Sequence, residues 1–450
     1  MGVETNAELI RALERRIQDG NGDVIELKRA RNSLLNISTR VPPEILADIF
    51  SWILFRPNPA PGADSHLHGL CKDSYNFLLV CNHWFQVVSH TPELWTYCGN
   101  TLQDWKKWFR RHPQSASVDL VLNDRPRATT QPSIDHTVQD ALRDHATRDI
   151  IRQVHLKCYD GKLLSIIVPS ITPEGEGVQC RSTESIDIRN QWMGPPGRGF
   201  FDVSHFFTRI RLPKLRNLLL HGLLKLPPWN HLVHQTTVLT TLSLRIEKSS
   251  QSLSPTASQF FSMLISNPGL QVLSLDGPVM PKDDDNGFAS QITLRHLEKL
   301  YLRGELHHVV MVLERLVFPH PLNFIQVVAF NSTVESVLQN LGSYVQRYFR
   351  GDRGFRDQLK LEAHAFHGIL FVVSVKGEHR ADGSSPFSAS FEVYPYRFVR
   401  EDVLQNLCHD FVTFIPQECV CTFDTNLPPD KLQDLYIAMP NIKGLDLVGL

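Results

Sequence analysis

The residues best suited to bind a metal ion are histidines and cysteines in two short clusters. His66, His68 and Cys71 lie close together and offer three zinc ligands. They have no second ligand pair at the usual zinc-site spacing, and their segment is rich in proline, so we expect a loop there. Cys419 and Cys421 alternate as residues of a strand do, which fits two small buried hydrophobic side chains. The sequence therefore predicts no metal centre.

Phosphate-binding, calcium-binding and nucleophile motifs are also missing from the sequence. The glycine-rich stretch 194–199 contains two prolines and lacks the Gly-Lys-Ser/Thr ending of a phosphate loop. The acidic run 283–285 lacks the alternate spacing of a calcium loop, and no Gly-x-Ser-x-Gly or His-Glu-x-x-His occurs. His307 and His308 fall on a predicted helix, where they need no chemical role. We therefore expect a protein that is not an enzyme and needs no cofactor.

Composition and charge favour a globular protein without a bulk electrostatic attraction to nucleic acid or membranes. Of 450 residues, 42% are hydrophobic, and 46 basic against 47 acidic residues give a net charge of −1. The eight cysteines show no disulfide framework, and no apolar run reaches the roughly 18 residues that span a bilayer. The start of the chain is charged and unlike a secretory signal. We expect a cytoplasmic or nuclear protein with no nucleic-acid or membrane partner.

Residues 105–112 combine aromatic and basic side chains, a composition found in nucleic-acid-binding patches. Trp105, Trp108 and Phe109 nevertheless share one helical face with Leu102, which leaves the basic side chains on the solvent side. We interpret the segment as a helix that joins the N-terminal region to the rest of the chain.

Residues 1–35 show helical periodicity in two runs. Apolar residues recur at three- and four-residue steps from Leu9 to Ile17, and the pattern resumes at Val24 after a break at 20–22. A helical hairpin that packs on its neighbours is the first interpretation. A partner-binding coiled coil is the alternative, although the stretch is shorter than three or four heptads.

Residues 36–100 show the helical pattern of a small domain, with a helix that begins at Val41-Pro42-Pro43-Glu44. Three pieces follow one another: Val41–Leu46 with Ile49-Phe50, then Val80-Cys81-Asn82-His83-Trp84, then Pro92-Glu93-Leu94-Trp95. Together they resemble the F-box, and the resemblance covers residues 36–98. The proline-rich stretch 56–73 is longer than the usual first link and is similar to the form common in fungal F-box proteins.

The F-box resemblance implies a partner and a docking face. F-box domains bind the Skp-type adaptor of cullin-based ubiquitin ligases, so the implied partners are that adaptor and, through it, a cullin. By this resemblance, the following residues contact the adaptor or shape the docking face, and some of them also serve the core: Pro42, Pro43, Ile45, Leu46, Ile49, Cys81, Trp84, Leu94 and Trp95.

Residues 101–450 carry an irregular repeat of the form apolar-x-x-apolar-x-apolar. Copies begin at residues 151, 183, 215, 239, 270, 297, 324 and 442, and those at 215, 239, 270 and 297 are 24, 31 and 27 residues apart. These spacings straddle the 20–29-residue leucine-rich repeat, in which a strand is followed by a returning helix. Return helices are predicted over 258–265 and 307–316. We therefore expect an α+β or α/β chain whose N-terminal helices and F-box precede an irregular leucine-rich-repeat-like solenoid.

An α/β domain with a parallel sheet is the alternative for this region, because it also alternates strands with helices. An irregular insert near 340–425 interrupts the regular spacing of the repeats. Ile369–Val375 and Ser388–Val393 there predict an antiparallel strand pair.

The target-binding surface is predicted from strand alternation. If the repeat leucines point inward, the residues between and after them point outward and form rows across neighbouring strands. Arginine and tyrosine are frequent hot spots at protein interfaces. The candidates are Arg189, His221, Arg245, Tyr301 and Arg303. The alternative is an ordinary solvated sheet face.

These features favour a substrate-recognition subunit of a cullin-based ubiquitin ligase of the SCF type, in which the repeats bind a protein target of unknown identity. One alternative is a non-catalytic repeat scaffold, or an adaptor-binding protein, without a role in ubiquitination. Another is an α/β hydrolase or transferase appended to a helical domain, which would require a matched nucleophile, base and pocket.

Overall fold

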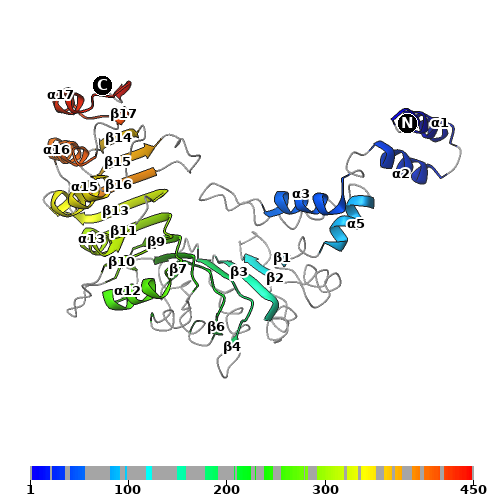
Figure 1. Cartoon of the computed structure of the whole chain (residues 1–450), viewed down its shortest axis with the longest axis horizontal. Helices are drawn as coiled ribbons and strands as arrows, with labels where there is room; N and C mark the ends of the chain where they lie inside the picture. The colour runs from blue at the N-terminus through cyan, green and yellow to red at the C-terminus, as the bar shows by residue number, and fades with distance from the viewer. Residues whose placement is uncertain are drawn as a thin grey trace, which may run out of the picture. The chain divides into compact units, whose positions relative to one another are not determined.

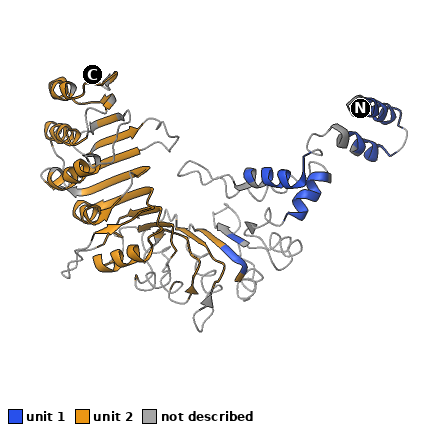
Figure 2. Cartoon of the chain, in the orientation of Figure 1, with its two compact units in different colours: residues 1–122, 133–141, 150–152 blue, residues 123–132, 142–149, 153–450 orange. Residues whose placement is uncertain are grey.

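The computed structural model divides the chain into two compact units (Figure 2). Unit 1 comprises residues 1–122, 133–141 and 150–152, and unit 2 comprises 123–132, 142–149 and 153–450. The structure describes residues 3–20, 23–35, 41–55, 82–91, 97–98, 118–123, 149–158, 178–190, 207, 210–223, 229, 238–246, 255–277, 279–281, 291–318, 322–332, 336–350, 359–366, 370–377, 388–395, 400–415 and 420–447.

Unit 1 begins with a helical hairpin where the sequence predicts one. Helix α1 spans Val3–Gln18 and α2 spans Val24–Leu35, and the two pack against each other. Gly20 between them adopts a left-handed backbone with φ of 65°, a conformation that glycine tolerates best. The Asp23 carboxylate accepts a hydrogen bond of 2.8 Å from the backbone N–H of Ile25 and so caps the start of α2.

A second helical pair in unit 1 has a small core of its own. Helix α3 spans Pro43–Phe55 and α5 spans Asn82–His90. Leu46 and Phe50 of α3 are buried with Val87 and Val88 of α5, and Trp84 packs edge-on against Phe50 with ring centroids 4.7 Å apart. The predicted helices near 91–95 and 102–109 lie mostly or wholly outside the described residues. Unit 1 also contains β1, Tyr97–Cys98, paired in parallel with β2, Val118–Asn123.

Unit 2 is built on a large, mostly parallel sheet. Its strands follow the order β3-β5-β7-β8-β9-β11-β13-β16-β15-β14-β17-β18, and β15 alone among them runs antiparallel to its neighbours. Short parallel pairs β4–β6 and β10–β12 accompany the sheet. The strand bounds are β3 Ile151–Cys158, β4 Val178–Gln179, β5 Ser185–Asn190, β6 Ile210–Arg211, β7 Asn217–Leu223, β8 Thr241–Ile246, β9 Val272–Asp276, β10 Ile292–Thr293, β11 Lys299–Glu305, β12 Leu316–Val317, β13 Phe324–Ser332, β14 Leu359–Phe366, β15 Leu370–Gly377, β16 Ser388–Pro395, β17 Val420–Thr425 and β18 Gly444–Leu447.

The repeated aliphatic residues meet in register across this sheet, as the sequence pattern predicts. In the copies that begin at residues 151 to 297, the second apolar residue of each copy pairs with its counterpart on the next strand, and all of these residues are buried. The resulting row is Val154, Ile186, Leu218, Leu242, Leu273, Leu300 and Ile325. In the copy at 442 the corresponding residue, Leu445, is instead 40% exposed. The prediction for β13 was wrong by two residues, because Leu300 pairs with Ile325 and the buried copy is therefore Leu322-Ile325-Val327.

The turns that enter successive strands repeat the same hydrogen-bond arrangement. One carbonyl oxygen in each turn accepts from two consecutive backbone N–H groups at the start of the next strand. The acceptors are the carbonyls of Glu184, Arg216, Thr240, Gln271 and Glu298. The backbone groups of each turn are thus hydrogen-bonded to the neighbouring repeat, which links each turn to the one before it.

Helices of unit 2 lie along one side of the sheet (Figure 1). They are α12 Ala257–Ser266, α13 Leu306–Arg315, the π-helix η3 Val337–Gly342, α15 Ser343–Arg350, α16 Glu401–Val412 and α17 Pro429–Ala438. Both predicted return helices are confirmed, as α12 and α13. A capping box starts α12: the Thr256 side chain accepts from the Gln259 N–H, and the Gln259 side chain accepts from the Thr256 N–H.

The region predicted as an irregular insert near 340–425 extends the main sheet. The predicted antiparallel pair is confirmed as β15 and β16, and β14 adds a third strand on the other side of β15. Strand β16 pairs in parallel with β13, whereas β14 pairs in parallel with β17. Helix α16 contacts both β14 and β15 and connects β16 to β17.

Burial raises the pKa of the Cys408 thiol on α16 to about 12. In the described part of the chain no helix is long and apolar enough to cross a membrane.

Gly222 in β7 provides a test of how closely neighbouring strands approach. Its φ is 68°, and a Cβ atom there would overlap the carbonyl oxygen of Asn190 on β5. We expect Gly222→Ala to lower the free energy of unfolding by about 2–4 kcal/mol in urea titration. Gly269→Ala is the matched control, since a Cβ there meets open space, and its effect should stay within about 1 kcal/mol. Equal effects of the two substitutions would contradict this packing.

Candidate functional site

Two surfaces carry the residues that the sequence singles out, one in each unit. The first is a strip on α3 of unit 1. Ile45 and Ile49 are 51% and 43% exposed, and Pro42 and Pro43 before them are exposed as well. Trp52, 61% exposed, extends the strip by another turn at the spacing i, i+4, i+7. Large apolar side chains gathered on one helix face are typical of an interaction site.

Not every predicted adaptor residue lies on this strip. Leu46 is only 3% exposed and belongs to the core with Phe50, and half-buried Trp84 packs on the same core, so these two side chains position the strip. Cys81, Leu94 and Trp95 lie outside the described residues. The sequence did not single out Trp52, although its spacing from Ile45 and Ile49 was a usable signal.

The second surface is the face of the sheet in unit 2 that carries the polar residues between the buried aliphatic ones. Strand pairing aligns Arg189, His221, Arg245, Asp276 and Arg303 as successive cross-strand neighbours from β5 to β11. The predicted site residues therefore come together in one row, and Tyr301 lies on the same strand face two residues before Arg303. We call the set Arg189, His221, Arg245, Asp276, Tyr301 and Arg303 the polar row.

Asp187 anchors the β5 end of this surface. Its carboxylate accepts two hydrogen bonds of 2.8 Å from the Arg189 guanidinium and lies 3.5 Å from Nδ1 of His155. Burial by itself raises the pKa of Asp187, but the hydrogen bonds from His155 and Arg189 outweigh it and hold the pKa below its usual value. From the sequence, the residues between the repeat leucines are expected to point outward, but Ser185, Asp187 and Ser243 at such positions are buried.

Asp276 joins two arginines at the β11 end. Its carboxylate lies 3.2 Å from Nε of Arg245 and 3.7 Å from a terminal nitrogen of Arg303, which come from the strands on either side. Burial raises the pKa of Asp276 although both arginines favour its charged form. One carboxylate neutralises one of the two guanidinium charges. The group therefore keeps a positive charge beside Tyr301, whose pKa is raised by burial and by Asp276.

His221 connects the two halves of the polar row. One of its ring nitrogens lies 2.8 Å from the hydroxyl oxygen of Ser243. Burial lowers the pKa of His221 to about 4; Asp187 opposes this shift, while Arg189 and Arg245 reinforce it. The imidazole is therefore neutral at physiological pH.

The Ser243–His221 pair resembles part of a nucleophilic site, but its surroundings do not complete one. An imidazole with a pKa of about 4 is a weak general base at neutral pH. Among the described contacts, the Asp187 carboxylate is held by Arg189 and His155 and not by His221. The arrangement is suited to binding by charge and hydrogen bonds.

Aromatic side chains border the polar row beyond β11. The Arg303 guanidinium lies over the Phe330 ring, 5.2 Å from its centroid, and Phe330 contacts Tyr394 with centroids 5.4 Å apart. On β16, Glu392 accepts a 2.8 Å hydrogen bond from the Gln326 amide of β13. A basic region on β5–β11 thus adjoins an aromatic region on β13 and β16.

The sequence matches no protein-family model, and no curated protein or solved structure matches it significantly.

His221 makes the stability of unit 2 sensitive to acid. In the unfolded chain a histidine binds its proton near pH 6.5, but in the fold only near pH 4, so the unfolded state binds more protons between these values. Stability should fall as the pH is lowered through this window, by about 1–3 kcal/mol from this residue. His221→Gln should reduce that loss in urea titrations at pH 7 and pH 4.5, whereas the exposed His296→Gln should not. Identical pH dependence of His221→Gln and wild type would contradict the assignment.

Proposed function

We propose that the chain is a non-catalytic substrate-recognition subunit of a cullin-based ubiquitin ligase, in which unit 1 binds a Skp-type adaptor and unit 2 binds a protein target. The observation that carries the proposal is the exposed Pro42-Pro43-Ile45-Ile49 strip above the buried Leu46–Phe50 core. These are the positions at which the sequence resembles the F-box. An apolar strip of this kind buries favourably against a partner, at about 25 cal/mol per Å² of apolar surface.

The second part of the proposal is that unit 2 is an irregular leucine-rich-repeat-like solenoid. Three features support it: parallel strands in sequence order from β3 to β13, an in-register row of buried aliphatic residues, and the repeated double-acceptor turn. Repeats of this type stack so that each one contacts mainly its neighbours and leaves one sheet face open to a ligand.

The polar row is the proposed target-binding surface. Between β3 and β11 the basic residues on this face outnumber the acidic ones: Lys157, Arg189, Arg245, Lys299 and Arg303 against Asp187, Asp276 and Glu305. Such a surface favours a target segment that carries carboxylates or other anionic groups. Arginine and tyrosine side chains supply large contact areas as well as hydrogen bonds.

In this proposal the chain performs no chemistry. It binds adaptor and target at once, which raises the effective concentration of the target's lysines at the ligase. A repeat scaffold that binds the adaptor without ubiquitination shares both surfaces. The two functions differ only in whether a captured protein becomes ubiquitinated in the reconstituted complex.

Adaptor binding is tested by shortening the exposed strip. We expect Ile45→Ala with Ile49→Ala to weaken co-purification of a Skp-type adaptor at least about tenfold, because two apolar anchors are lost while the core keeps Leu46 and Phe50. Ile265→Ala on α12 removes an equally exposed isoleucine from unit 2 and should leave adaptor binding unchanged. Wild-type adaptor binding by the double variant would reject the F-box assignment.

Target capture is tested on the polar row. Replacing Arg245, Tyr301 and Arg303 together with alanine should abolish capture of target proteins, measured by affinity purification and mass spectrometry, while adaptor binding persists. The matched control replaces Arg211, Lys214 and Arg216, which are exposed. Targets retained by the first triple variant would place the target site elsewhere in the chain.

A further inference from the structure

A strand and a helix of unit 2 join without a loop at Glu305. Strand β11 ends at this residue and α13 begins at Leu306. The strand is paired on both sides, with β9 and with β13, and six buried side chains of α13 hold the helix. The backbone that carries Glu305, His307 and His308 is therefore fixed, and only side-chain torsions remain free.

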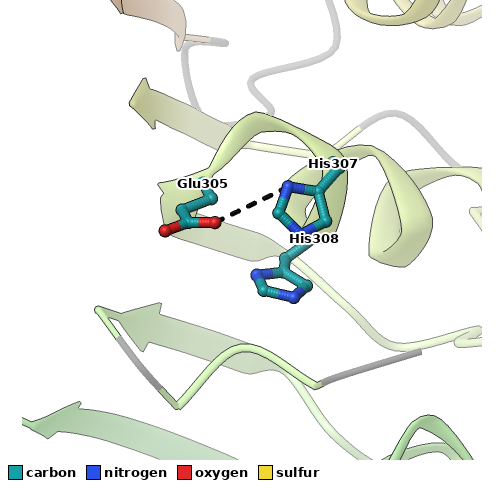
Figure 3. Close-up of side chains that lie close together, drawn as sticks. All are labelled: Glu305, His307 and His308. Atoms are coloured by element: carbon teal, nitrogen blue, oxygen red, sulfur yellow. Dashed lines mark ion pairs between the residues drawn. The ribbon is translucent and has the colours of Figure 1, made fainter. Parts of the chain in front are cut away.

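The three side chains lie close together (Figure 3). Nδ1 of His307 lies 3.7 Å from a carboxylate oxygen of Glu305, and the two imidazole rings have centroids 3.8 Å apart with an angle of 43° between their planes. One potential ligand atom from each residue lies within 4.8 Å of the other two. Two protonated imidazoles in such contact would repel each other, whereas a shared cation would hold them together.

We infer that Glu305, His307 and His308 bind one divalent transition-metal ion of the Zn²⁺ class, at a site that the sequence did not predict. Two imidazole nitrogens and one carboxylate oxygen form a ligand set that zinc accepts with a water in the fourth position. Ligand atoms in a tetrahedral zinc site lie roughly 3.4 Å apart, given bonds of about 2.0–2.2 Å. Glu305 and His307 are exposed and His308 is half-buried, so small side-chain rotations can bring the ligand atoms to that spacing.

The charges around the junction between β11 and α13 indicate whether the metal ion would be exchangeable or structural. The N-terminus of α13 opposes a bound cation only weakly at the protein surface, and the Glu305 carboxylate offsets this effect. Because the core of unit 2 is complete without an ion, the site is an open, exchangeable one and not a structural zinc centre. Glu305 follows Tyr301 and Arg303 in the alternation of β11, so the ion lies at the end of the polar row.

Titration of the full chain with Zn²⁺ by isothermal calorimetry tests the inference. We expect a site of micromolar affinity that is weakened at least about tenfold by His307→Ala, by His308→Ala and by Glu305→Gln. The triple variant His66→Ala, His68→Ala, Cys71→Ser removes the other candidate zinc ligands that the sequence contains. This variant should still bind Zn²⁺ with micromolar affinity. His296→Ala, which removes an exposed histidine outside the cluster, should keep it too.

Two results would overturn the inference: no Zn²⁺ binding by the wild-type chain, or equal binding by wild type and both histidine variants. Thermal unfolding followed by circular dichroism checks that the variants fold. Co²⁺ absorption adds a second readout, since loss of its visible bands in His307→Ala and His308→Ala would support coordination by the imidazoles.

Discussion

The in-register burial of aliphatic side chains across parallel strands is the constraint on which unit 2 depends. Leu218, Leu242, Leu273 and Leu300 are direct cross-strand neighbours and are buried. A shift of one residue in any strand would turn its leucines to the opposite face, so each pairing fixes the register of the next. Because the strands from β3 to β13 are aligned this way, residues from distant parts of the sequence become direct cross-strand neighbours on the opposite face of the sheet.

That alignment explains the electrostatics of the polar face. Charged residues at equal positions in successive repeats become neighbours, and several are too buried to remain unpaired. Asp276 meets this requirement by pairing with arginines on both adjacent strands, and Asp187 by pairing within its own strand and with His155. His221, flanked by arginines, stays neutral instead. The same face therefore contains ion pairs whose charges cancel, and it also keeps a net positive charge.

The sequence predicted the structure well where hydrophobic periodicity alone determines it. It predicted less well where two apolar residues could each occupy the same buried position. The leucine pattern predicts the strands from β3 to β11 and the helices α12 and α13, because burial leaves one register. It misplaced the copy in β13, because Phe324 and Leu322 are both apolar and only Leu322 is buried. It also predicted adaptor contact for Leu46 without showing that this side chain is core. The Glu305–His307–His308 cluster was missed because spacing does not reveal that a strand passes into a helix without a loop.

The meander formed by β14, β15 and β16 sets the order in which the sheet can assemble. Lys299 pairs with Phe324, 25 residues along the chain, but Phe324 pairs with Ser388, 64 residues along. Closing the longer loop costs only about 0.8 kcal/mol more, yet it delays contact formation. Strand β17 docks on β14, which is separated from β13 by β15 and β16, so the C-terminal strands gain their place in the sheet only after the meander has closed. Local pairing can propagate from repeat to repeat up to β13, whereas β14, β17 and β18 join the main sheet only through the longer-range closure of the meander.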